Sequence, residues 1–211
     1  MPLIALALLV LTPVALAQPA YSRPELGAWL GLSLHSPVGD RLGITPDREF
    51  MVLAVRYSRP LFSIGRVSLH FQPEIIPAAV VTSNPEYESE QAGSGDETFE
   101  LKRITGYGPV YGAGIAPAAL ELRVRMHRRF DLFGGGSFGA LIFTRSVPVP
   151  NARAYNITFD AGGGIRLALD ERRRIIAGYR FHHLSNAWTA RENPGLDAQL
   201  FYAGGMLSLN R

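Results

Sequence analysis

Residues 120–126 read Leu-Glu-Leu-Arg-Val-Arg-Met, an unbroken alternation of apolar and charged side chains. Successive side chains of a β-strand point to opposite faces, so this stretch has one apolar face and one charged face. The same two-residue period recurs near residues 51–58, 66–72, 156–167 and 174–184, whereas helical periodicity is scarce. This pattern is typical of long strands that separate an apolar from a polar environment.

We expect about eight strands, near residues 25–36, 48–59, 65–82, 110–126, 129–146, 153–169, 173–186 and 197–209. Prolines at positions 73, 77 and 117 should mark bulges. Short turns near residues 60–65, 127–129 and 170–173 alternate with generally longer connections near 37–45, 83–107, 147–153 and 187–196. Short periplasmic turns and longer external loops are the asymmetry of bacterial barrels.

The sequence therefore predicts an all-β fold, an eight-stranded antiparallel transmembrane β-barrel. Polar side chains of such a barrel face the interior and apolar ones face lipid. The residues expected inside are Glu121, Arg123, Arg125, Asp160, Arg166 and Arg180. Eight strands enclose a space just large enough for side chains, so a wide pore is not expected.

Export is indicated by the apolar run of residues 1–17, which ends in Ala15, Leu16 and Ala17. This small-x-small ending predicts a signal peptide cleaved before Gln18, with residues 18–211 forming the barrel. The chain has no cysteine, so it has neither a lipoprotein anchor nor disulfides. Its net charge of +3 comes from scattered basic residues, which argues against nucleic acid as a partner. The bacterial outer membrane is the expected location.

A candidate catalytic group lies in residues 181–186, which read Phe-His-His-Leu-Ser-Asn. On one strand His183 and Ser185 share a face, and the next strand can return Asp197 to orient the histidine. Serine, base and orienting carboxylate are the parts of a nucleophilic hydrolase. In the predicted topology the group lies at the outer end of the wall, facing lipid, where an outer-leaflet ester could meet it. From the residues alone, a polar cluster that only contacts lipid headgroups is an equal alternative.

A second serine, Ser137, lies in a G-x-S-x-G match formed by residues 135–139. A nucleophile elbow requires a turn from strand to helix, and this segment continues as an apolar strand. Ser137 is therefore not expected to be the nucleophile.

Residues 178–187 (Gly-Tyr-Arg-Phe-His-His-Leu-Ser-Asn-Ala) and 192–197 (Glu-Asn-Pro-Gly-Leu-Asp) resemble the outer-membrane lipid A 3-O-deacylases of the PagL type. The resemblance implies an eight-stranded barrel with its active site on the outer surface. It gives Ser185 the place of the nucleophile and His183 that of the general base. Asp197 stands where the family commonly has Glu. Asn193 matches the oxyanion-hole asparagine, with Asn186 as its supporter.

Two departures from the family pattern carry expectations of their own. Trp188 occupies a position where a small residue, usually Gly, is expected. The shorter carboxylate of Asp197 predicts that Asp197→Glu keeps or raises activity, because a longer side chain would reach His183 more easily.

The resulting hypothesis is a serine esterase that removes the 3-position hydroxyacyl chain of lipid A in the outer leaflet. It needs no metal and no organic cofactor. Its expected partner is lipid A within lipopolysaccharide, and the sequence leaves a homodimer open. The alternatives are a phospholipase-like acyl esterase with the same triad and a non-catalytic outer-membrane barrel that binds surface lipids.

Overall fold

The computed structural model describes residues 23–33, 42–45, 48–94 and 97–209, so the expected signal peptide lies outside the described residues. The described chain is built from β-strands, and none of its segments is a helix long and apolar enough to cross a membrane. The strands are β1 (Glu25–Ser33), β2 (Phe50–Ile64), β3 (Val67–Phe71), β4 (Glu74–Ser94), β5 (Glu97–His127), β6 (Phe130–Val147), β7 (Arg153–Ala168), β8 (Arg173–Ser185) and β9 (Leu196–Ser208).

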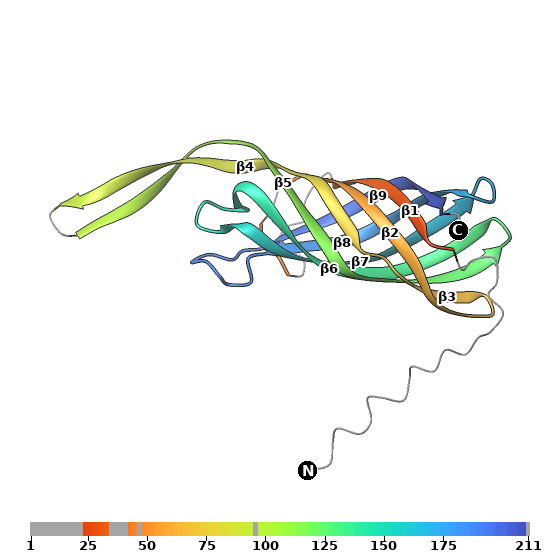
Figure 1. Cartoon of the computed structure of the whole chain (residues 1–211). Coiled ribbons are helices and arrows are strands. Elements are labelled where there is room, and N and C mark those ends of the chain that lie inside the picture. Colours follow the sequence, from red (N-terminus) through yellow and green to blue (C-terminus); the bar gives the residue numbers. More distant parts are fainter. Residues whose placement is uncertain (1–22, 34–41, 46–47, 95–96, 210–211) are drawn as a thin grey trace, which may run out of the picture.

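The strands form one closed antiparallel ring (Figure 1). β1 pairs with both β2 and β9, and the latter pairing closes the barrel. β3 and β4 lie one after the other between β2 and β5, so together they occupy a single position in the wall. The ring thus has eight strand positions, which confirms the predicted eight-stranded antiparallel barrel.

Two of the three prolines, Pro77 and Pro117, lie at bulges as expected. Pro73 lies between β3 and β4. The pairing of β4 with β5 shifts register between Ile76 and Ala79, on either side of Pro77, and β5 with β6 shifts between Ile115 and Ala118 around Pro117. Because proline cannot donate to the strand ladder, the wall bulges at these points.

The expectation of a loop at residues 83–107 was wrong. Strands β4 and β5 stay paired far beyond the barrel, down to Ser94 opposite Glu97, and project as a two-stranded arm (Figure 1). In the arm, β4 contributes Glu86, Glu88 and Glu90, while β5 contributes the apolar residues Phe99, Leu101 and Ile104. A cross-strand ion pair joins Glu88 to Arg103 (3.8 Å). Pairing across the hairpin therefore outweighs the low strand propensity of the β4 sequence.

The barrel interior is filled by ion pairs. Arg123 bonds Glu121 (2.6 Å) and Glu25 (2.9 Å), and Arg166 bonds the same Glu25 oxygen (2.7 Å). The residues predicted inside are buried, apart from Arg125, which is half-buried near the turn after β5. On the outer wall, Leu122 is 45% exposed. The charged lumen and apolar exterior match the polarity of a membrane barrel.

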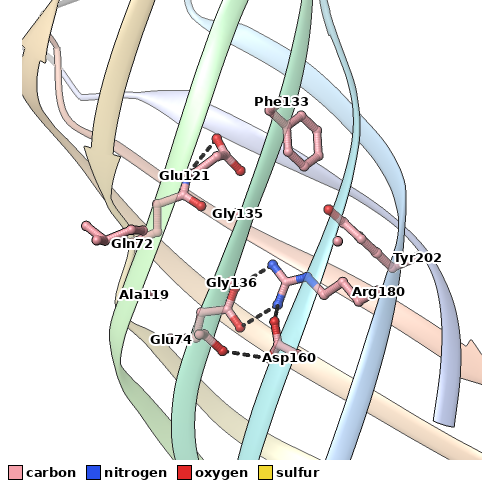
Figure 2. A pocket seen from close by; sticks show the side chains of 13 residues that line it. Gln72, Glu74, Ala119, Glu121, Phe133, Gly135, Gly136, Asp160, Arg180 and Tyr202 are labelled. Atoms are coloured by element: carbon pink, nitrogen blue, oxygen red, sulfur yellow. Dashed lines mark hydrogen bonds and ion pairs between the residues drawn. The ribbon is translucent and has the colours of Figure 1, made fainter. Parts of the chain in front are cut away.

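One internal cavity of the barrel has a volume of about 20 Å³, enough for about one water molecule. Figure 2 shows Arg180 between Glu74 and Asp160, with both carboxylates 3.2 Å from its guanidinium nitrogens. Asp160 also accepts a hydrogen bond from Ser137 (2.6 Å), so this serine faces the lumen, and the segment around it is strand β6, as expected. The lumen is a packed polar core.

Candidate active site on the outer wall

Strand β8 brings His183 and Ser185 to the outer face of the barrel. The burial pattern of β8 alternates, with His182 and Leu184 buried and His183 and Ser185 half-buried. His183 pairs in register with Phe159 of β7, which is 43% exposed on the same outer face. The candidate base and nucleophile therefore lie on the lipid-facing wall at the end of the strand.

Asp197, on the neighbouring strand β9, stands directly opposite His183 in the strand register. Its Oδ1 lies 2.7 Å from Nδ1 of His183. The Asp197 side chain is only 1% exposed although the wall here faces outward. A buried carboxylate this close to Nδ1 favours the tautomer that carries its proton on Nδ1 and leaves Nε2 free to accept one.

Ser185 is the member of the group that is not yet hydrogen-bonded. Within the described residues, no hydrogen bond joins its hydroxyl to His183. Two residues apart on one face, the pair is separated by roughly 6–7 Å of strand rise. Catalytic hydrogen bonds are often long without substrate and tighten when it binds. The geometry brings the two side chains to one surface and leaves the final contact to be made.

The loop after Ser185 is held by the two asparagines of the sequence prediction. The Asn186 backbone N–H donates to Oδ1 of Asn193 (2.9 Å), and the Asn186 side-chain amide donates to the Glu192 carbonyl (2.7 Å). Because a backbone N–H can only donate, Oδ1 of Asn193 is the atom that faces it. The Nδ2 group of Asn193 is then the donor left for another acceptor. Asn186 thus orients Asn193 through its backbone.

Trp188 lies at the tip of this loop and is 77% exposed. Thr189 N–H donates to the Asn186 carbonyl (3.1 Å), which makes residues 186–189 a turn with Ala187 (φ +51°) and Trp188 (φ +61°) at its centre. Positive φ at both central positions defines a type I′ turn, which favours Gly and Asn. This preference explains why the family resemblance leads one to expect glycine at position 188.

Sequence reasoning missed the segment of residues 42–45, which follows β1. Leu42 N–H donates to Oδ2 of Asp197 (3.0 Å), and Thr45 Oγ1 donates to the Gly195 carbonyl (2.6 Å). Residues 42–45 cover the carboxylate, which explains why Asp197 is buried on an outer wall. No periodic signal marks contacts between positions about 150 residues apart in the chain.

Among the described residues, no group of three or more His, Cys, Asp or Glu side chains is arranged to hold a metal ion. The external connections between β6 and β7 and between β8 and β9 lie at the same end of the barrel as the β4–β5 arm (Figure 1). The candidate group is therefore at the rim of the barrel from which the arm projects.

A closed eight-position ring with a charged core and a polar group on its apolar outer wall defines a small outer-membrane β-barrel. The family model for lipid A 3-O-deacylase (PagL) matches residues 94–204, which is more than half of the chain. The chain belongs to this lipid A 3-O-deacylase family, and it is a protein of the bacterial outer membrane.

A solved structure of the family supports the fold. The crystal structure of the outer-membrane enzyme PagL matches with a TM-score of 0.54 at 12% identity, covering 85% of this chain and 97% of that one. Neisserial surface protein A matches with a TM-score of 0.49 at 10% identity, covering 88% of this chain and 97% of that one. No curated protein matches the chain by sequence.

Proposed function

We propose that this protein is a serine esterase that hydrolyses the ester at the 3-position of lipid A, with Ser185, His183 and Asp197 as its catalytic triad. The observation that carries the proposal is the 2.7 Å contact of a buried carboxylate with a half-buried histidine on the lipid-facing wall. If His183 and Asp197 formed only a structural ion pair, Ser185 would not be needed on the same face of the strand. Family membership supplies lipid A as the substrate.

In the proposed reaction, Oγ of Ser185 attacks the ester carbonyl while Nε2 of His183 takes the hydroxyl proton. Asp197 stabilises the imidazolium that forms, as an orienting carboxylate does in serine hydrolases. The tetrahedral intermediate collapses, and His183 returns the proton to the departing 3-hydroxyl of the sugar. Water, activated by the same histidine, then releases the 3-hydroxy fatty acid from Ser185.

Asn193 is the proposed oxyanion donor. Its Nδ2 group has no hydrogen-bond partner within the described chain, and its orientation is set by the backbone N–H of Asn186. A donor that is oriented before the reaction stabilises the developing negative charge without reorganisation. Asn186 has the supporting role, because it positions Asn193.

The location of the site suits a substrate held in the membrane. On the outer wall Phe159 lies opposite His183, and farther along the same face Phe201 (67% exposed) packs against Tyr179. A water-soluble ester would have to enter lipid to reach Ser185, whereas lipid A in the outer leaflet is already there. Lipid A is the only partner proposed, because neither the fold nor the family match supports a homodimer. The absence of a cofactor stays a prediction.

The decisive experiment is mass spectrometry of lipid A from Gram-negative cells that express the wild type, Ser185→Ala, His183→Ala or Ser137→Ala. We expect loss of one hydroxyacyl group with the wild type and Ser137→Ala, and intact lipid A with Ser185→Ala and His183→Ala. Release of phospholipid acyl chains in place of the lipid A chain would favour a phospholipase. Unchanged lipids in all strains, with folded barrels, would favour a non-catalytic barrel.

A further inference from the structure

Residues 42–45, which we call the β1–β2 segment, run across the start of β9. Ile44 N–H donates to the Pro194 carbonyl (2.8 Å), and Thr45 Oγ1 donates to the Gly195 carbonyl (2.6 Å). Leu42 N–H donates to Oδ2 of Asp197 (3.0 Å). Residues 42–45 thus bond three residues at the start of β9 and just before it: Pro194, Gly195 and Asp197.

Two glycines allow this close contact. A Cβ at Gly43 would lie 2.9 Å from the backbone nitrogen of Asp197 and from the carbonyl carbon of Gly195. A Cβ at Gly195, where φ is +64°, would lie 2.9 Å from Cε1 of His183 and 3.2 Å from Cα of Gly43. The β1–β2 segment, the backbone of residue 195 and the His183 ring are therefore stacked in direct contact. A side chain at either glycine would force these layers apart.

The carboxylate of Asp197 depends on this segment for half of its hydrogen bonds. It is 1% exposed, and within the described residues it has no Lys or Arg partner. A buried carboxylate requires donors to replace lost water. His183 supplies one donor to Oδ1, and Leu42 supplies one to Oδ2. With a donor on each oxygen, the carboxylate plane has a defined orientation, and so has the imidazole that it bonds.

We propose that the β1–β2 segment is a positioning element of the esterase, which acts through Asp197 by means of the Leu42 N–H and the close packing of Gly43. This inference rests on the proposed function. Residues 42–45 make no hydrogen bond to Ser185 or Asn193 within the described chain. The segment therefore controls the rate of the chemical step and leaves substrate affinity unchanged. The side chains of Leu42 and Ile44 are exposed (59% and 66%), whereas Asp197 is buried.

The test compares Leu42→Pro, which removes the N–H donor, with Leu42→Ala, which keeps it and removes the apolar side chain. Full-length protein folded in detergent is assayed on purified lipid A. We expect kcat of Leu42→Pro to be roughly 10- to 100-fold below that of Leu42→Ala, with KM unchanged, because hydrogen bonds to charged groups are of this strength. Gly43→Ala should lower kcat in the same way. Gly205→Ala, whose Cβ would find its nearest neighbour at 3.9 Å, is the matched control and should keep wild-type kcat.

A double-mutant cycle shows whether the effect passes through Asp197. In an Asp197→Ala background, Leu42→Pro should cause no further loss of kcat. An equal loss in both backgrounds, or equal kcat for Leu42→Pro and Leu42→Ala, would overturn the proposal. Activity that persists in Ser185→Ala would instead refute the proposed function, so the two failures are distinguishable.

A second pair of variants covers the case in which Leu42→Pro does not fold. Thr45→Val deletes the hydroxyl that bonds the Gly195 carbonyl, and Thr45→Ser keeps it. The serine variant should exceed the valine variant in kcat by about fivefold, in line with a neutral hydrogen bond. Identical kcat for these two folded barrels would also contradict a positioning role.

Discussion

Lengthening the orienting carboxylate by one methylene, in Asp197→Glu, should reduce activity. The family resemblance led us to expect the opposite, since Asp was thought too short to reach His183. The structure contradicts that premise, because Oδ1 of Asp197 already lies 2.7 Å from Nδ1. The strand register, which places Asp197 directly opposite His183, suits the shorter residue.

The size of the effect follows from the space around the carboxylate. One C–C bond adds about 1.5 Å of length. Asp197 is 1% exposed, with His183 against one oxygen and Leu42 N–H 3.0 Å from the other. The longer side chain must displace the imidazole or the β1–β2 segment. Losing one hydrogen bond to a charged group costs about 1.5–3 kcal/mol. That cost corresponds to a roughly 10- to 150-fold decrease in kcat.

The assay is release of the hydroxy fatty acid from lipid A by folded protein in detergent, with kcat and KM measured separately. Asp197→Asn is the companion variant: it keeps the length and removes the charge, and it should lose more than Asp197→Glu while retaining activity above Ser185→Ala. Equal or higher kcat in Asp197→Glu than in the wild type would refute the reasoning. It would mean that the contact at 2.7 Å does not set the position of the base.

Three further changes test other parts of the structure. Asn193→Ala should lower kcat about 10²- to 10³-fold with little change in KM, if its amide is the oxyanion donor, and an unchanged kcat would exclude that role. Leu122→Arg places a charge on the outer wall and should lower the free energy of unfolding by about 2–4 kcal/mol, measured by urea unfolding from lipid vesicles. Met126→Arg, near the end of β5, is its control and should cost no more than about 1 kcal/mol. Trp188→Gly should relieve about 1–2 kcal/mol of positive-φ strain in the 186–189 turn, so slower proteolysis of this loop is expected and faster proteolysis would contradict it.

The wall of the barrel could be read from the chain because its signal is local. An alternation such as that of residues 120–126 places Glu121 and Arg123 inside and Leu122 outside, whatever the neighbouring strands do. The same parity put His183 and Ser185 on one face. Ser137 was set aside for another local reason, because its segment continues as a strand, and the structure places it in strand β6. The candidate nucleophile and base were therefore accessible to reasoning from periodicity.

The β4–β5 arm could not be predicted from the periodicity of the sequence. The Glu-rich β4 sequence has low strand propensity, and it pairs only because β5 lies beside it in register, with Glu88 opposite Arg103. Propensity describes one segment at a time, whereas the stability of a hairpin is a property of two. Nothing in either segment separately distinguishes this arm from a loop.

The order of the strands, their two faces and the side of the wall that carries Ser185 and His183 were already contained in the alternation of the chain, because side-chain direction repeats every two residues. The environment of Asp197 was not. Its burial and its second hydrogen bond depend on closure of the ring, which brings Leu42 against a strand more than 150 positions away. Closure is a property of the whole barrel, so the cover over the orienting carboxylate formed only when the first and last strands met.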